Sequence, residues 1–273
     1  MSVEYKLASR QNRSEDTLIT LGGQIIGGKH FTIIAGPCAV ESEAQIDETA
    51  AFLAENGIGL MRGGAYKPRT SPYSFQGLGE RGLEILAAAG AKYGLRIVTE
   101  AMDIVAIERL AENADMIQIG SRNMQNFPLL KAAGKINKPI LLKRGLSATI
   151  NEFLLAAEYI LEAGNESIVL CERGGRGFNE YTRNVLDIGA IPLLQQLSHL
   201  PVIADPSHAA GRSDLIAPLS RAAAAIGAHG LMIEVHPHPD KALSDGNQSL
   251  NFSQFEALLK TIKPFSYLAG ESR

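Results

Sequence analysis

Hydrophobic residues fall into eight short, nearly continuous runs that alternate with longer segments of helical periodicity. Runs of this kind are typical of parallel strands, because both faces of such a strand are buried. Between them, segments such as 42–56, 149–164 and 213–230 carry apolar residues at helical spacing, and several end at glycine, the usual C-terminal stop. The predicted strands are residues 31–36, 57–62, 95–100, 115–120, 139–144, 167–172, 201–206 and 230–235.

Strand–helix units repeated eight times within about 240 residues predict an α/β fold, the closed (β/α)₈ TIM barrel. An open doubly wound sheet is the alternative, but no glycine-rich phosphate-binding fingerprint follows the first strand. Ahead of the barrel, Gly22-Gly23 separates two apolar runs, which predicts a β-hairpin over residues 17–28 that closes the bottom of the barrel. We therefore expect a single domain over residues 1–273, with the barrel at about 31–262 and residues 1–16 partly flexible.

The composition excludes several classes of protein. The net charge is −3 and charged residues make up 20% of the chain, so no global basic field points to nucleic acid. The longest apolar runs fall far short of the roughly 20 residues of a membrane span, and the N-terminal segment does not resemble a signal peptide. The two cysteines do not make a disulfide framework, and Cys171 is interpreted as a small buried hydrophobic residue. These features favour a cytoplasmic protein.

Cations gather at the ends of the predicted strands. The segment 61–77, MRGGAYKPRTSPYSFQG, carries three of them and no acidic residue. A single basic residue at a strand end is most often a solvated loop charge. In a (β/α)₈ barrel, however, these ends share one rim, and cations from four strands have no reason to converge there without an anion. Because such cations suit phosphate and carboxylate groups, we expect a small, highly anionic ligand at Arg62, Lys67, Arg69, Arg122, Lys143 and Arg173.

A second group of residues offers metal ligands. Cys38 and His208 follow the first and seventh predicted strands, and Glu234 lies near the end of the eighth; these strands are neighbours once the barrel closes. A mixed thiolate, imidazole and carboxylate site is typical of a catalytic divalent metal. Spacing alone leaves further ligands open, and His236 with His238 is a reasonable choice. The candidates in this segment are His236, His238, Asp240 and Asp245.

At these residues the chain resembles the 3-deoxy-D-arabino-heptulosonate 7-phosphate (DAHP) synthases, in the short microbial type close to the 3-deoxy-D-manno-octulosonate 8-phosphate (KDO8P) synthases. The resemblance extends from about Phe31 to Leu259. It implies a metal-dependent, aldol-type condensation of phosphoenolpyruvate with D-erythrose 4-phosphate, which gives DAHP and phosphate and opens the shikimate pathway to the aromatic amino acids. The matching motifs, in order, are AGPCAVES, MRGGAYKPRTSPYSFQG, VTEAMD, QIGSRNMQN, LLKRG, CERG, DPSHAAGR and EVHPHPDKALSDG.

The resemblance also implies a role for individual residues. Its metal ligands are Cys38, His208, Glu234 and Asp245. Its phosphoenolpyruvate-binding residues are Arg62, Lys67, Glu100, Arg122, Lys143 and Arg173. Its residues for erythrose 4-phosphate are Lys67, Arg69, Thr70, Ser71 and Asp205. Lys67, Glu100 and His208 are the expected catalytic residues, while His236 and His238 become rim residues.

The family also suggests a cofactor and an assembly. One divalent metal ion is expected, with Mn²⁺ preferred and Fe²⁺, Zn²⁺ or Co²⁺ as alternatives. The family is usually oligomeric, so we expect a homotetramer that binds small-molecule substrates. Relatives that respond to pathway products carry an added domain. The short segments outside the predicted barrel cannot form such a domain, so we expect no inhibition by phenylalanine, tyrosine or tryptophan.

Three alternatives are weaker. KDO8P synthase, which uses arabinose 5-phosphate, resembles this chain except that its motif after the second strand reads Lys-Ala-Asn-Arg-Ser, whereas residues 67–71 read KPRTS. A Schiff-base aldolase with Lys143 as its nucleophile leaves the metal-ligand set unexplained. A non-catalytic sensor of phosphorylated metabolites needs the cations but not the metal ligands.

Overall fold

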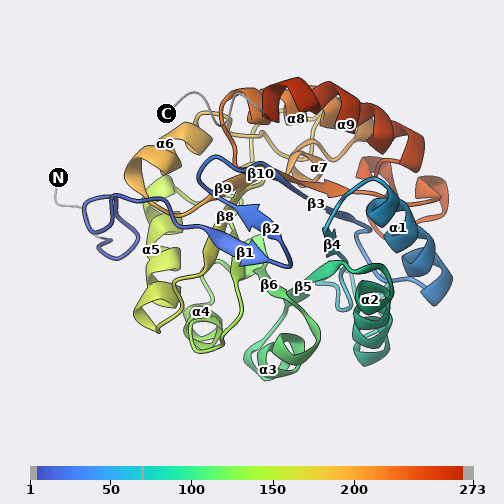
Figure 1. Cartoon of the computed structure of the whole chain (residues 1–273), viewed down its shortest axis with the longest axis horizontal. Helices are drawn as coiled ribbons and strands as arrows, with labels where there is room; N and C mark the ends of the chain where they lie inside the picture. The colour runs from blue at the N-terminus through green and yellow to red at the C-terminus, as the bar shows by residue number, and fades with distance from the viewer. Residues whose placement is uncertain (1–4, 69–70, 267–273) are drawn as a thin grey trace.

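The structure is a computed structural model that describes residues 5–68 and 71–266. Eight parallel strands close into a barrel, in the order β10-β3-β4-β5-β6-β7-β8-β9 around the ring, and helices surround it (Figure 1). The prediction of a (β/α)₈ barrel is confirmed. The barrel strands are β3 (Thr32–Gly36), β4 (Leu60–Arg62), β5 (Arg96–Ala101), β6 (Met116–Ile119), β7 (Ile140–Lys143), β8 (Ile168–Glu172), β9 (Val202–Ala204) and β10 (Gly230–Glu234).

The helices begin at polar caps that the sequence supplies. Thr149 and Glu152 form a reciprocal capping box at the start of α5, and Ser42 accepts a hydrogen bond from the N–H of Gln45 at the start of α1. None of the helices in the described residues has the length and apolar character needed to cross a membrane. The α-helices are α1 (Glu43–Glu55), α2 (Glu80–Tyr93), α3 (Ile104–Asn113), α4 (Phe127–Ala133), α5 (Ile150–Glu162), α6 (Ala190–Leu197), α7 (Pro206–Ala210), α8 (Ile216–Ala225) and α9 (Phe252–Ser266). The 3₁₀ turns are η1 (Ser121–Asn123), η2 (Ser213–Leu215), η3 (Pro239–Lys241) and η4 (Gly246–Gln248).

Two barrel strands, β4 and β9, are only half as long as the hydrophobic runs suggest. The run 57–62 yields a strand only from Leu60 onward, because Gly57, at φ 72°, belongs to the turn that ends α1. The run 201–206 ends as a strand at Ala204, because Asp205 caps α7 through the N–H of His208. In both cases, residues of the apolar run form the end or the cap of a neighbouring helix instead of a strand.

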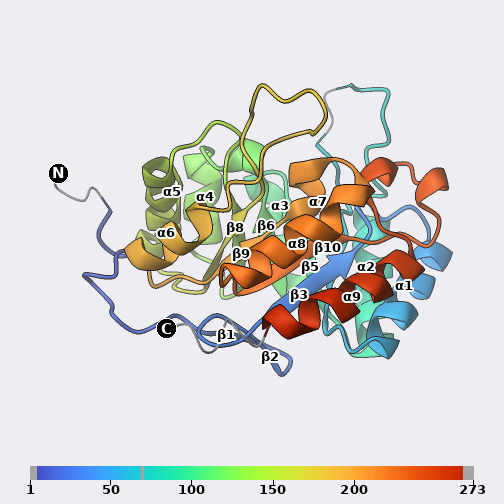
Figure 2. The same ribbon diagram turned by 90° about the horizontal axis from the view of Figure 1, so that it is seen from above.

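The predicted hairpin is present and closes one end of the barrel. Its strands β1 (Ile19–Leu21) and β2 (Gln24–Ile26) pair in antiparallel orientation. The side chains of Ile19, Leu21 and Ile26 form one buried cluster with the inward-facing residues of the barrel strands. Figure 2 shows the hairpin at one end of the barrel, opposite the long loop that follows β8.

The N-terminal segment contacts the barrel through polar groups. Residues 5–16 of the stretch predicted to be partly flexible lie within the described part, residues 1–4 lie outside it, and the flexibility stays a prediction. The carboxylate of Glu158, on α5, accepts hydrogen bonds from the three consecutive N–H groups of residues 6–8 at 2.7–2.9 Å. His199, which is buried, contacts the carbonyl oxygen of Leu7 through Nε2 at 2.8 Å. Polar contacts hold this segment, and an analysis of hydrophobic periodicity does not detect them.

Candidate active site

The inward-facing row changes from apolar to polar at the C-terminal end of seven of the eight barrel strands, all except β3. In β7, Leu141 lies in the buried interior cluster, and Lys143, two residues later, lines a cavity. In β10, Met232 in the same cluster is followed by Glu234. Because side chains alternate along a strand, the residue two positions beyond an inward apolar residue also faces the axis. The same step leads from Leu60, Val98, Met116, Cys171 and Ile203 to Arg62, Glu100, Gln118, Arg173 and Asp205.

A cavity of about 280 Å³ opens at this end, and cations dominate its lining. Six cationic side chains and two carboxylates line it. The cations are Lys67, Arg122, Lys143, Arg173, Arg176 and Arg183, and the carboxylates are Glu100 and Asp245. The structure therefore brings together five of the six residues predicted to bind phosphoenolpyruvate, and it adds Arg176 and Arg183, which the sequence analysis missed.

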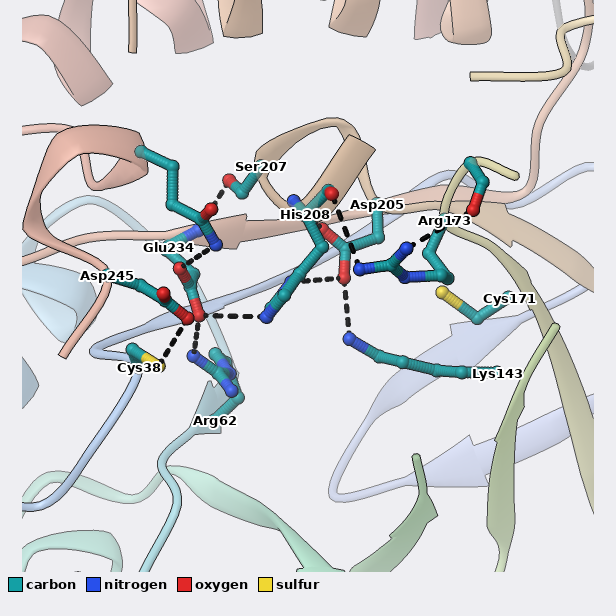
Figure 3. A network of polar contacts seen from close by, with 12 residues as sticks. Cys38, Arg62, Lys143, Cys171, Arg173, Asp205, Ser207, His208, Glu234 and Asp245 are labelled. Carbon is teal, nitrogen blue, oxygen red and sulfur yellow. Dashed lines mark hydrogen bonds and ion pairs between the residues drawn. The ribbon is translucent and has the colours of Figure 1, made fainter. Parts of the chain in front are cut away.

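The sixth of those residues, Arg62, is buried below the cavity. Its Nη1 donates to Glu234 Oε1 at 2.8 Å (Figure 3). The same nitrogen donates to the carbonyl oxygen of Pro37 at 2.7 Å. Its Nε is buried and has no hydrogen-bond partner among the described residues. A buried donor without a partner is rare, and a bound ion or ligand is one of its explanations.

The predicted metal ligands converge beside the cavity. Ligand atoms of Cys38, Glu234 and Asp245 all lie within 4.8 Å of one another. The fourth residue, His208, places Nε2 3.3 Å from Glu234 Oε1, and Cys38 Sγ lies 3.1 Å from Asp245 Oδ2 (Figure 3). One sulfur, one imidazole nitrogen and two carboxylates fit a divalent transition metal.

The charges around Cys38 oppose one another. Burial raises the pKa of the Cys38 thiol to about 12, and the carboxylate of Glu234 acts in the same direction, while Lys67 opposes both. Lys67 Nζ lies 3.0 Å from Cys38 Sγ and 3.0 Å from the Cys38 carbonyl oxygen. Metal binding at this residue requires loss of the thiol proton. A bound metal cation would replace that proton. Lys67 lies at the boundary between the metal-ligand group and the cation-lined cavity.

Residues that no sequence pattern singled out orient the two carboxylates of the metal-ligand group. Gln248 Nε2 donates to Glu234 Oε2 at 2.7 Å. Arg183 Nη1 contacts Gln248 Oε1 at 3.0 Å and Asp245 Oδ1 at 3.3 Å. Asp245 has a φ of 53°, a left-handed conformation that is uncommon outside glycine. Gln248 lies three residues beyond Asp245 and just outside the motif that ends at Gly246, and this proximity is the only sequence signal for it.

Asp205 connects the cation-lined cavity with the metal-ligand group. Its Oδ2 accepts hydrogen bonds from Lys143 Nζ at 2.5 Å and from His208 Nδ1 at 2.7 Å (Figure 3). Burial acts to raise the pKa of Asp205, but His208 and Lys143 hold it well below its usual range. With Nδ1 facing Asp205, His208 turns Nε2 toward Glu234. Asp205 is fully buried and already paired, so the structure gives it a positioning role, and its predicted contact with erythrose 4-phosphate stays a prediction.

The remaining predicted residues belong to the KPRTS segment and to the pair His236 and His238. Arg69 and Thr70 lie outside the described residues, and Ser71 is exposed. His238 is exposed, as expected of a rim residue, whereas His236 is buried and faces Glu41. His236 thus lies just beyond the end of β10, as expected of a rim residue, but its side chain is covered.

Glu100 is held in place by Gln118 and by a glycine. Gln118 Nε2 donates to Glu100 Oε2 at 2.8 Å. A Cβ atom at Gly120 would lie 2.1 Å from Glu100 Oε1, so the Glu100 side chain would have to move to avoid the clash. The absence of a side chain at residue 120 is therefore a requirement of this carboxylate position.

Gly120→Ala is expected to displace Glu100 and to lower kcat about tenfold, a change of about 1.4 kcal/mol in the activation barrier. Because Glu100 is a flexible side chain at the cavity surface, the thermal unfolding temperature should change little. Gly189→Ala is the matched control, since a Cβ there meets only Asp187 Oδ1 at an ordinary 3.6 Å. Steady-state kinetics and thermal unfolding of both variants provide the measurement, and an unchanged kcat for Gly120→Ala would contradict the role given to Glu100.

Comparisons with known proteins agree with this geometry. The family model described as the DAHP synthetase I family matches residues 9–268. A phospho-2-dehydro-3-deoxyheptonate aldolase from Thermotoga maritima is 59% identical over 266 residues, which cover 97% of this chain and 79% of that protein. A 2-dehydro-3-deoxyphosphooctonate aldolase from Granulibacter bethesdensis is 33% identical over 96% of this chain and 99% of its own length.

Solved structures show the same relationship. The crystal structure of the Thermotoga maritima DAHP synthase superposes with a TM-score of 0.96 at 57% identity, and the match covers 99% of this chain and 79% of that one. A truncated form of the Thermotoga maritima 3-deoxy-D-arabino-heptulosonate 7-phosphate synthase gives a TM-score of 0.91 at 54% identity, covering 97% of this chain and 98% of that one. From the family match and this identity, we conclude that the chain is an enzyme that belongs to the DAHP synthetase I family.

Proposed function

We propose that this enzyme joins phosphoenolpyruvate to the aldehyde of D-erythrose 4-phosphate, and that it forms DAHP and releases phosphate with one divalent metal ion bound. The observation that carries the proposal is the contact between two sites. The cation-lined cavity and the metal-ligand group share Lys67, His208 and Asp245 at their boundary. An anionic substrate in the cavity therefore has its reacting carbon next to the metal-ligand group.

The cations of the cavity perform the first task, which is to hold two anions side by side. Phosphoenolpyruvate and a sugar phosphate repel each other in water. Arg122, Lys143 and Arg173 offer forks and point charges that suit phosphate and carboxylate oxygens. Fixing both substrates in a reactive geometry converts a bimolecular encounter into an effectively unimolecular step, which contributes several kcal/mol.

The chemical step needs a more electrophilic aldehyde, because the enol carbon of phosphoenolpyruvate is a weak nucleophile. A divalent ion held by Cys38, His208, Glu234 and Asp245 would supply Lewis-acid polarisation of that carbonyl group. Lys67, the cation at the boundary, delivers a proton to the aldehyde oxygen as the new carbon–carbon bond forms.

The second half of the reaction takes place at C2 of the former enol. Bond formation at C3 leaves positive charge at C2, and water adds there. Glu100, fixed by Gln118, orients this water and accepts its proton. The resulting phosphohemiketal collapses, the C2–O bond to the phosphoryl group breaks, and phosphate leaves into the cationic cavity.

The choice of sugar follows from the relatives and from one motif. The relative at 59% identity is named for the heptonate product, and those at about one third identity are named for the octonate. The motif KPRTS at residues 67–71 also favours erythrose 4-phosphate, with Arg69 on its phosphate. We further propose Mn²⁺ as the native ion, a homotetramer as the assembly and the cytoplasm as the location.

An assay of phosphate release tests this function. With phosphoenolpyruvate present, erythrose 4-phosphate should support turnover at least about 100-fold faster than arabinose 5-phosphate, because a pocket matched to one sugar disfavours the other by a few kcal/mol. EDTA should abolish release, and Mn²⁺ added in excess should restore it. Equal rates with both sugars would contradict the substrate assignment, and full activity in EDTA with no bound metal would contradict the metal.

A further inference from the structure

Glu41 and His236 form a buried pair outside the metal-ligand group. Their side chains are 10% and 6% exposed, and His236 Nε2 lies 3.4 Å from Glu41 Oε2. His236 Nδ1 accepts a hydrogen bond from the N–H of His238 at 3.0 Å. Since Nδ1 is an acceptor, the ring proton is on Nε2 and points at Glu41. The donor is thus fixed by the fold.

Glu41 also holds a second point of the loop that contains His238. Its other oxygen, Oε1, accepts a hydrogen bond from the N–H of Leu243 at 2.8 Å. One carboxylate therefore ties the two ends of the segment 236–243. A nearly buried carboxylate needs both of these donors, because an unpaired charge in this environment is costly.

The two segments that Glu41 joins both carry members of the metal-ligand group. Cys38 precedes Glu41 by three residues, and Ser244 and Asp245 directly follow Leu243. Cys38 Sγ contacts Ser244 Oγ at 3.0 Å and Asp245 Oδ2 at 3.1 Å across the gap between these segments.

The Glu41 side of this gap is firmly anchored. The Glu41 N–H donates to Gln45 Oε1 at 3.1 Å, and Gln45 Nε2 donates to the carbonyl oxygen of Ala39 at 3.2 Å. Gln45 lies in α1, so the segment after Cys38 is fixed to a helix. The Asp245 side is a long loop, and its position depends on such ties.

We propose that Glu41 and His236 act as positioning residues that set the separation of Cys38 and Asp245 and thereby the affinity for a divalent ion. The claim about ion affinity rests on the metal site proposed above. The claim about the separation of Cys38 and Asp245 does not. Partners behind the ligands of a metal site commonly change metal affinity by 10–100-fold. Neither residue touches substrate-binding cations or takes part in the chemical step.

The separation can be tested without metal or turnover, because the chain has two cysteines. In EDTA-treated full-length protein, the alkylation rate of Cys38 and Cys171 is measured separately by mass spectrometry. Glu41→Ala should speed alkylation of Cys38 about tenfold, since the Asp245 loop opens more often, and should leave Cys171 unchanged. Glu43→Ala is the matched control, because Glu43 is two residues away and exposed, and its ion pair with Arg81 is on the surface.

Two milder variants keep the test decisive if Glu41→Ala does not fold. Glu41→Gln retains one acceptor for Leu243 or His236, and should show a smaller effect in the same direction. His236→Asn keeps an acceptor for the N–H of His238 but cannot reach Glu41, and should behave like Glu41→Gln. An unchanged Cys38 rate in these variants would overturn the proposal, and so would equal acceleration of both cysteines, which indicates general loosening.

The affinity is measured by competition between each protein and a calibrated chelator for Mn²⁺ or Co²⁺. Glu41→Ala should bind about 10–100-fold more weakly than the wild type, and Glu43→Ala should match the wild type. Unchanged affinity would overturn the second part of the proposal. If the wild type itself binds no ion, the metal function fails, while the alkylation rates still decide whether Glu41 and His236 position the loop.

Discussion

Cys38→Ala is expected to lower kcat/KM about 1,000-fold or more while the protein stays folded. The Cys38 sulfur is one of the four proposed ligands, and Lewis-acid activation contributes several kcal/mol, of which each 1.4 kcal/mol is a factor of ten in rate. The side chain is small, and Lys67 keeps its hydrogen bond to the Cys38 carbonyl oxygen, so the free energy of unfolding should fall by less than about 2 kcal/mol. Kinetics, metal analysis and denaturant unfolding provide the measurements.

Cys171→Ala is the matched control for this prediction. Cys171 is equally buried, but it lies in the interior cluster of the barrel rather than in the metal-ligand group. Its replacement should lower the free energy of unfolding by about as much as Cys38→Ala does. It should leave metal content and kcat/KM nearly unchanged. A Cys38→Ala protein with normal metal content and a rate close to the wild type would remove Cys38 from the ligand set.

Lys143→Met is expected to lower kcat/KM about 1,000-fold and also to destabilise the fold. The ammonium group is buried against Asp205, and removing one partner of a buried ion pair costs about 3–5 kcal/mol. We expect a value near 3 kcal/mol, because His208 continues to donate to the same carboxylate. The activity falls because the cation is lost from the cavity that we propose to hold phosphoenolpyruvate.

The double variant Lys143→Met/Asp205→Asn separates the two effects. With the unpaired charge gone, the free energy of unfolding should recover by at least about 1.5 kcal/mol relative to Lys143→Met, whereas kcat/KM should stay low. Urea unfolding with a constant m-value gives the stabilities. Recovery of activity in the double variant would mean that Lys143 acts only by neutralising Asp205 and does not bind substrate.

The barrel itself could be predicted from the sequence because burial on both faces leaves a strong local signal. Each strand appears as an apolar run, and each rim residue appears at the end of one. The predicted strand boundaries are wrong where the end of a helix and the start of a strand involve the same residues. Gly57 follows an apolar helix and precedes an apolar strand, and its left-handed backbone assigns it to the turn that ends the helix.

The sequence predicts those residues of the candidate site whose position depends on a single strand. Lys143 and Glu234 each lie two residues beyond an inward-facing apolar residue of the same strand. Their inward orientation therefore follows from the alternation of side chains along that strand. The contact of Arg62 with Glu234 joins residues 172 positions apart, and it depends on closure of the ring. Spacing alone favoured His236 with His238, but in the described residues the ligand atom near Cys38 and Glu234 is from Asp245, at the end of a loop whose path no periodicity encodes.

The hairpin at the closed end of the barrel has an electrostatic consequence. Ile19, Leu21 and Ile26 extend the apolar cluster that lies beneath the cations, and an apolar interior has a low dielectric constant. Water can screen the charges only from the mouth, and the field of the cations is therefore directed outward along the barrel axis. A short segment remote from any reacting atom thus strengthens the attraction that an approaching anion experiences, and it does so without contributing a charge.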